Sequence, residues 1–419
     1  MKTTFLILFL AITASAMAQI VHETNVTVET LAGSGFSGNV DGVGTETMFY
    51  NPSRIVFDGA QTLFIVDKGG NPFSARLRKL IIPSVTVSTL QTNQYPFGPS
   101  GIHFRGPIAG EIFLTTRYSI QSINLTSSNS AVFAGEPSTP GNESGAVLDA
   151  RFDVITDIEV NAGGTIFVSD TAANNKIRAI TNGNVFTYAG SGNFGYEDGN
   201  GIFSSFTTIN AICMDSAGNI YVGDGVKVRK ISGGRFVSTL AGFVHNSTEY
   251  SDGFGTNASF REATGICINQ LGEIFVSDRL AHSIRKIDLN GMVTTVAGNG
   301  FSLSGYANGD GQSARFKNPS DVAALPDGSL LVADAGNNRI RRISFSGSPP
   351  IGEQPALAIN NYAGLDISGT PGRTYKIESS LEMTNWNQEA IISLPSTKYL
   401  WIDTNSPSQS KKFYRATLQ

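Results

Sequence analysis

The strongest constraint in this sequence of 419 residues is a short apolar segment that recurs six times. Five of the copies end in Asp and the second ends in Thr, and a glycine a few residues upstream of most copies suits a hairpin. Successive copies end 49 to 56 residues apart. The copies are Leu63–Asp67, Ile112–Thr116, Ile166–Asp170, Ile220–Asp224, Ile274–Asp278 and Leu330–Asp334. A period of this length indicates one supersecondary unit used repeatedly.

Each copy is accompanied by three further segments with strand character. One precedes it, one with basic residues follows it, and a fourth ends in Ala-Gly, as in Thr187–Gly190. Four short strands at a period near 50 residues describe a blade of a β-propeller. The sequence therefore predicts an all-β, six-bladed propeller over residues 26–346.

The sixth copy lacks its fourth strand, because the chain reaches Pro349 and Pro350 soon after Ile343. A matching segment, Val26–Gly33, stands alone before the first copy. We expect this N-terminal strand to complete the last blade and close the ring, which leaves no open sheet edge.

These motifs resemble the NHL-repeat family of β-propellers, as found in secreted bacterial proteins. The family pattern runs Pro-x-Gly-Ile, Gly-x-Ile-Tyr-Val-x-Asp, Asn-x-Arg-Ile-Arg and Thr-x-Ala-Gly, and the third to sixth copies match it best. The resemblance implies a fold, whereas fold alone does not imply an activity.

The N-terminus has the features of a secretory signal peptide over residues 1–18. Lys2 precedes an apolar run from Phe5 to Ile12, and Ala16-Met17-Ala18 forms a small-x-small cleavage motif. We expect a chain exported to the periplasm, the cell surface or the medium, with no membrane span. The net charge of −4 argues against nucleic acid as a partner, and we expect a monomer.

The composition changes after the repeats. We expect a linker over residues 347–356 and a small β-sandwich over residues 357–419. Thr384-Asn385-Trp386 and Phe413-Tyr414-Arg415 are similar to motifs of the fibronectin-type-III-like modules that end many secreted bacterial proteins.

An Asp and a following Arg recur together and are lost together in the second copy, which has Thr116 and Gln121. Coupled loss indicates that the two side chains serve each other as structural pairs rather than as catalytic groups. The expected pairs are Asp67 with Arg78, Asp170 with Arg178, Asp224 with Arg229, Asp278 with Arg285, and Asp334 with Arg341.

Two other recurring sets have oxygen, nitrogen or sulfur ligands. Asp-Gly loops begin at Asp41, Asp198, Asp252 and Asp310, and turn chemistry explains them better than calcium binding does. One column of the first strands carries Val56, His103, Glu159, Cys213, Cys267 and Ala323. Its middle four residues are zinc-ligand types, but packing between blades with two unbridged thiols is the simpler interpretation.

The remaining candidates lie where the first strands begin, at the mouth of the central channel. Gluconolactonase-type propellers, which this chain resembles, hold a divalent metal there with Glu, Asn and Asp. By that resemblance Asp157, Asn210 and Asp321 would hold a metal such as Ca or Zn, and Arg54 would hold an anionic substrate. Solvated strand ends are the alternative interpretation.

We therefore expect a non-catalytic binding or scaffold protein without a cofactor, which uses a propeller face to bind a protein or a glycan. The alternative is a metal-dependent hydrolase or lyase at the channel mouth, which requires Asp157, Asn210 and Asp321 to converge.

Overall fold

The structure is a computed structural model of the whole chain. It describes residue 23, residues 25–345 apart from 71–73, 93–97, 107–109, 245–249 and 299–302, and, beyond these, residue 373 and six strands between 356 and 418. The expected signal peptide, most of the linker and Thr384–Trp386 lie outside the described residues.

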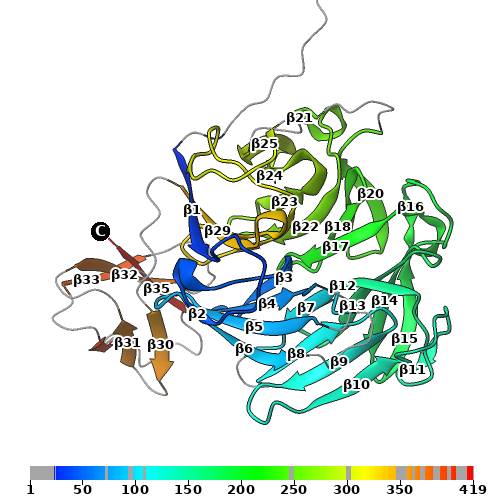
Figure 1. Cartoon of the computed structure of the whole chain (residues 1–419), viewed down its shortest axis with the longest axis horizontal. Helices are drawn as coiled ribbons and strands as arrows, with labels where there is room; N and C mark the ends of the chain where they lie inside the picture. The colour runs from blue at the N-terminus through cyan, green and yellow to red at the C-terminus, as the bar shows by residue number, and fades with distance from the viewer. Residues whose placement is uncertain are drawn as a thin grey trace, which may run out of the picture.

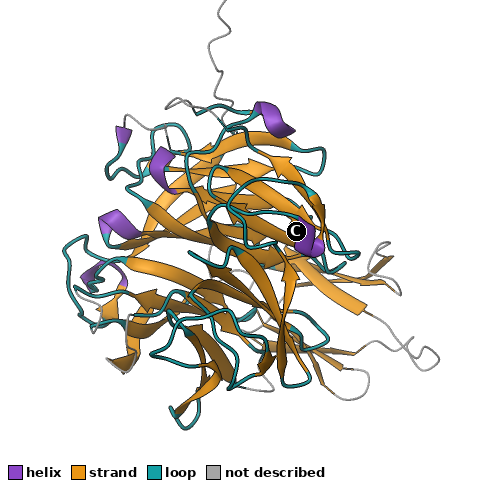
Figure 2. Ribbon diagram, turned by 90° about the vertical axis from the view of Figure 1, so that its right-hand side faces the viewer, coloured by secondary structure: helices purple, strands orange, loops and turns teal. Residues whose placement is uncertain are grey.

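The described chain is almost entirely β, with a few short 3-10 turns (Figure 2). Six antiparallel sheets follow the six sequence copies, as predicted. The innermost strands are β3 (Pro52–Phe57), β7 (Gly101–Phe104), β12 (Val154–Val160), β17 (Ile209–Met214), β22 (Ala263–Ile268) and β27 (Pro319–Ala324). Each contacts the next, and β27 contacts β3, so the six strands form a closed ring.

The second and third strands carry the Asp and the Arg in every blade except the second, which has Thr116 and Gln121. The second strands are β4 (Thr62–Asp67), β8 (Glu111–Thr115), β13 (Ile166–Thr171), β18 (Ile220–Asp224), β23 (Ile274–Asp278) and β28 (Leu330–Asp334). The third strands are β5 (Arg76–Ile81), β9 (Ser119–Asn124), β14 (Lys176–Thr181), β19 (Lys227–Ile231), β24 (Ser283–Ile287) and β29 (Arg339–Phe345).

The N-terminal strand β1 (Val26–Ala32) is the fourth strand of the sixth blade. It pairs antiparallel with β29, with Val28 opposite Ile343, so the predicted closure is confirmed (Figure 1). The other fourth strands are β6 (Thr86–Thr92), β10 (Ser130–Gly135), β15 (Asn184–Ala189), β20 (Phe236–Ala241) and β25 (Met292–Ala297). Glu23 extends this closure, because its backbone N–H donates to Thr295 and its carboxylate bonds Lys286 in blade five.

Five blades have a fifth strand of two residues that the sequence did not predict. Three of these strands begin at the glycine of an Asp-Gly loop and the other two begin at Gly145 and Gly309. Each pairs with the outer strand of the blade that follows it. These strands are β2 (Gly42–Val43), β11 (Gly145–Ala146), β16 (Gly199–Asn200), β21 (Gly253–Phe254) and β26 (Gly309–Asp310). The 3-10 turns are η1 (Gly44–Glu46), η2 (Gly201–Phe203), η3 (Gly255–Asn257), η4 (Arg279–Ala281) and η6 (Ala335–Asn337).

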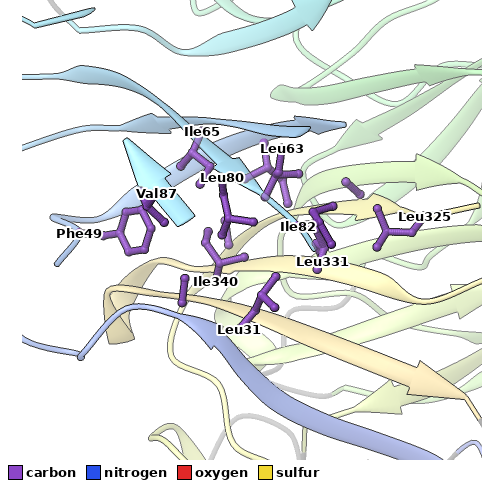
Figure 3. Close-up of a cluster of buried hydrophobic side chains, with 14 residues drawn as sticks. Leu31, Phe49, Leu63, Ile65, Leu80, Ile82, Val87, Leu325, Leu331 and Ile340 are labelled. Carbon is purple, nitrogen blue, oxygen red and sulfur yellow. The ribbon is translucent and has the colours of Figure 1, made fainter. Parts of the chain in front are cut away.

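The core lies between neighbouring blades. Alternate residues of each strand face one neighbour and the others face the opposite neighbour, so both faces of most blades are apolar. Figure 3 shows the cluster between blades six and one, where Leu31 of β1 and Ile340 of β29 pack with Leu63 and Leu80. The N-terminal strand is therefore held by packing as well as by its ladder.

Beyond the propeller, two sheets of three strands pair in the orders β30-β31-β34 and β33-β32-β35. The strands are β30 (Ala356–Asn360), β31 (Gly364–Ser368), β32 (Thr374–Ser380), β33 (Asn387–Ser393), β34 (Lys398–Ile402) and β35 (Phe413–Leu418). The first begins at Ala356, one residue before the predicted boundary.

None of the helices in the described part of the chain is long and apolar enough to cross a membrane.

Candidate functional site

Arg54 lies at the centre of the propeller. Its side chain leaves β3 and donates to backbone carbonyls of the five other blades: Nε to Ser100 (2.9 Å), Nη1 to Thr264 (2.8 Å) and Ser320 (3.2 Å), and Nη2 to Thr156 (3.4 Å) and Asn210 (2.6 Å). A guanidinium has five N–H donors, so these five bonds use all of them. The expectation that Arg54 holds an anionic substrate by hydrogen bonds is therefore wrong, because the group is a plug across the channel.

A ring of small polar side chains surrounds this plug. The residue at position 53 and its equivalents in the other repeats are hydroxylated or amides in every blade: Ser53, Ser100, Thr156, Asn210, Thr264 and Ser320. Five of them donate to a carbonyl of the next blade, as Asn210 does to Ala263 (3.1 Å) and Ser320 to Pro52 (3.0 Å). Asn210 thus links the fourth blade to the fifth by a hydrogen bond. The recurrence of a small polar residue at one repeat position is the sequence signal for this ring, of which the prediction named only Asn210.

Two carboxyl groups, Asp157 and Asp321, come one residue after the polar ring along their strands. Asp157 accepts a hydrogen bond from the Ile212 N–H (2.9 Å), and Asp321 accepts one from the Ile55 N–H (2.9 Å). Each therefore bridges its inner strand to the next. Burial raises the pKa of Asp157 to about 7 although Arg54 opposes it, and burial likewise raises the pKa of Asp321 to about 6.

The two ends of the channel are separate cavities, which we name by the direction of the inner strands. The upper cavity, where these strands begin, has a volume of about 600 Å³ and is lined by Arg54, Asn210 and others. The lower cavity, toward their ends, has a volume of about 330 Å³ and is lined by Asp157, Asp321 and others. The expected convergence of Asp157, Asn210 and Asp321 is therefore corrected: the plug divides them.

The lower cavity also contains the whole column of Val56, His103, Glu159, Cys213, Cys267 and Ala323. His103 Nδ1 lies 3.4 Å from Glu159 Oε1, and both cysteines are free thiols. Burial raises the pKa of the Cys213 thiol well above its usual range. Within the described ranges, no three His, Cys, Asp or Glu side chains are grouped so that they could hold a metal ion.

The upper cavity is polar. Its described lining includes the amides Asn51, Asn210, Asn318 and Asn338, hydroxyls of the polar ring, and the charged residues Lys68, Arg279 and Glu262. Arg279 bonds Glu262, with Nε 2.7 Å from Oε2. Asn51 and Asn318 have φ of 62° and 49°, a left-handed conformation that Asn tolerates better than most residues. This end of the channel can hold a hydrophilic ligand of small-molecule size.

The Asp and Arg columns form ion pairs inside the blades. The shortest N–O distances are 3.3 Å (Asp67–Arg78), 3.0 Å (Asp170–Arg178), 2.9 Å (Asp224–Arg229), 3.4 Å (Asp278–Arg285) and 2.9 Å (Asp334–Arg341). All ten side chains are fully buried, and burial raises the pKa of each Asp, to about 6 for Asp67 and Asp170.

The Asp-Gly loops are part of the same networks. Arg285 Nη2 lies 2.6 Å from the Asp252 carboxylate, which also accepts a bond from Thr295 Oγ1 (3.0 Å). Asp41 and Asp198 bond Arg78 and Arg229 in the same way. In the sixth blade Asn308, not Asp310, takes this place against Arg341 (2.8 Å). The loop carboxylates thus fix each loop to the blade that follows it, and Asp310 was assigned to the wrong column.

Each of these guanidiniums also lies over a Phe ring, at 4.7 to 5.5 Å from the centroid. The rings are Phe49, Phe152, Phe206, Phe260 and Phe316, a recurrence that sequence reasoning missed. The second blade replaces the network with neutral bonds, because Ser119 Oγ contacts both Thr116 Oγ1 (2.8 Å) and Gln121 Nε2 (3.1 Å).

The chain shows sequence similarity to known proteins over parts of its length. The NHL repeat family matches residues 316–343, which make up most of the sixth blade. Teneurin-3 of Mus musculus is 32% identical over 149 residues, which are 31% of this chain and 5% of teneurin-3. Protein SUPPRESSOR OF QUENCHING 1, chloroplastic, of Arabidopsis thaliana is 31% identical over 97 residues, 23% of this chain and 9% of that protein. The matches span less than a tenth of these relatives.

Solved structures share the fold at low sequence identity. An auxiliary nutrient binding protein from Bacteroides ovatus superposes with a TM-score of 0.60 at 18% identity, covering 77% of each chain. A protein of unknown function from Bacteroides thetaiotaomicron superposes with a TM-score of 0.59 at 17% identity, covering 76% of each chain. This level of likeness concerns the fold alone.

Proposed function

We propose that the protein is an exported, non-catalytic binding protein that holds a glycan in the upper cavity. The observation that carries this proposal is the Arg54 plug. It turns the mouth of the channel into a blind cavity whose floor is a ring of backbone carbonyls and polar side chains.

The chemistry of the lining favours a polyhydroxylated ligand. Side-chain amides such as those of Asn51 and Asn318 both donate and accept, which matches sugar hydroxyls. The volume of about 600 Å³ falls within the range of roughly 300–1,000 Å³ that is typical of small-molecule sites. The only carboxylate among the described lining residues, Glu262, is engaged by Arg279. A solved propeller of this fold is a nutrient binding protein, so the architecture suits such a use.

A glycan array followed by titration calorimetry on the hits tests the proposal. The double variant Asn51→Gly/Asn318→Gly removes two amides and keeps a residue that tolerates the left-handed backbone. We expect it to weaken binding at least about tenfold. Gln270→Ala, which removes an amide from the lower cavity, is the matched control and should bind normally. Normal binding by the double variant, or an array without hits, would refute the proposal.

The second candidate is a hydrolase or lyase working in the lower cavity. It is favoured by one observation, the pKa of about 7 for Asp157 beside the His103–Glu159 contact, because titratable groups with shifted pKa values gather at catalytic sites. A divalent metal that co-purifies with the wild type and is absent from Asp157→Asn would favour this candidate. Elemental analysis of both purified proteins measures it.

A further inference from the structure

The charges that line the two cavities have opposite signs. The described lining of the upper cavity has three cations, Arg54, Lys68 and Arg279, against the single carboxylate of Glu262, an excess of two positive charges. The lower cavity has Asp157, Glu159 and Asp321, and no Lys or Arg lines it among the residues described. The whole chain has a net charge of −4, so the positive upper cavity is a local feature.

The three cations of the upper cavity differ in what they can still bind. Arg54 has all five N–H donors on carbonyls, so it contributes charge but no free donor. Arg279 contributes to an ion pair with Glu262. Lys68 is different: only its backbone N–H is bonded, to Asn51 O (3.3 Å), and its ammonium has no hydrogen bond or ion pair within the described part of the chain.

The surroundings of Lys68 leave its charge uncompensated. Lys68 is exposed to solvent at the edge of the cavity. Partial desolvation nevertheless lowers the pKa of its ammonium, and the positive charges of Arg54 and Arg279 lower it further. An anion placed beside this ammonium would relieve the repulsion among the three cations, and because Lys68 is exposed, salt would screen the attraction.

We infer that the ligand of the upper cavity is an acidic glycan, whose carboxylate pairs with Lys68 while its hydroxyls bond the amides and hydroxyls of the wall. This inference rests on the proposed function, since it specifies the ligand class of the same site. One free ammonium among neutral amides fits a sugar with isolated carboxylates, such as a uronic acid. The carboxyl groups of the lower cavity, Asp157, Glu159 and Asp321, would disfavour such a ligand there.

The test compares two probes with the same sugar backbone, trigalacturonate and its uncharged methyl ester, by titration calorimetry at low and high salt. The wild type should bind the acid at least about tenfold more tightly than the ester, and salt should weaken binding of the acid. Lys68→Gln should lower the affinity for the acid to that for the ester. Asn318→Asp removes an amide that both probes would contact and adds a carboxylate at a left-handed position that Asp tolerates, so it should weaken binding of the acid more than binding of the ester. Lys79→Gln, which removes one charge outside the cavity, is the control for net charge.

Equal affinity for acid and ester, or acid binding that Lys68→Gln does not change, would overturn the inference while leaving the proposed function intact. If neither probe binds, the inference is also overturned, and the glycan array then decides the proposed function: hits among neutral glycans retain it, and no hits reject both.

Discussion

Arg54 Nη2 lies 2.6 Å from the carbonyl oxygen of Asn210, which is three blades away around the ring. A single side chain therefore joins opposite sides of the propeller through its centre. The other four bonds of the same guanidinium reach the four remaining blades, so the group opposes both widening and shearing of the ring.

Replacing Arg54 with Met should destabilise the propeller by roughly 3 kcal/mol, because five carbonyls lose a charged donor and only water can replace it. Arg54→Lys keeps the charge but has three donors, so its loss should be intermediate. Chemical denaturation measures both. Arg105→Met removes an arginine that is half exposed beside Glu111, and should cost less than about 1 kcal/mol. Equal losses at positions 54 and 105 would contradict the plug.

Replacing Arg285 with Ala should cost more than about 3 kcal/mol, because it leaves two buried carboxylates, Asp278 and Asp252, without their cation. The double variant Asp278→Thr/Arg285→Gln imitates the second blade. Ser283 already occupies the position that Ser119 has there, two residues before the Gln.

The double variant should therefore be more stable than Arg285→Ala, and adding Asp252→Ser should recover more stability. Denaturation of the whole series measures the coupling between positions 278 and 285. Purely additive losses would show that the two side chains do not serve each other.

The carboxyl of Asp157 makes the stability depend on pH in an unusual direction. Its pKa is about 7 in the folded protein, against 3.8 as the reference value, so between these values the folded state binds its proton more tightly than the unfolded chain does. Stability from this group is present at low pH and is lost as the pH rises toward 7. Relative to Asp157→Asn, the wild type should lose roughly 2–4 kcal/mol between pH 4 and pH 8.

Asp215 provides the control of opposite sign. Burial opposes the shift, but hydrogen bonds from Asn219 lower its pKa, so wild-type stability relative to Asp215→Asn should fall only as the pH drops below 3.8. Thermal melts of the wild type, Asp157→Asn and Asp215→Asn from about pH 2 to pH 8 give both curves. If the stability of the wild type and that of Asp157→Asn change with pH in parallel, folding does not raise the pKa of Asp157 and the prediction is wrong.

Deleting residues 19–33 should aggregate or unfold the protein, because β29 loses its partner β1 and β26 loses the only strand it pairs with among the described residues. A chain that begins at Glu23 keeps this residue and β1, and it should melt like the mature chain. Light scattering and melting curves distinguish them. A monomeric, normally melting protein without residues 19–33 would show that the ring does not need this strand.

The C-terminal strands are expected to form a separate module. Proteolysis near Ser348 should release a propeller and a fragment of about 60 residues, each with its own melting transition, which is a marginal but workable size for an independent fold. A single cooperative transition of the intact chain, with both fragments insoluble, would place the boundary elsewhere.

The repeat in the sequence was sufficient to predict the propeller, its six blades and the role of Val26–Gly33. Blade strands are specified locally, by apolar alternation and turn glycines, and a missing fourth strand has only one matching segment to replace it. The pairing of Asp278 with Arg285 was also readable, because the second copy changed both positions at once.

What the sequence could not supply was the direction in which side chains near the channel point. Asp157 and Asn210 stand at neighbouring repeat positions, yet they line opposite cavities, because the inner strands run along the channel and the plug falls between these two levels. Arg54 occurs at one position of one copy, so no internal repetition marked its role. Five carbonyls converge on it only once the ring is closed, and that convergence is a property of the tertiary structure alone.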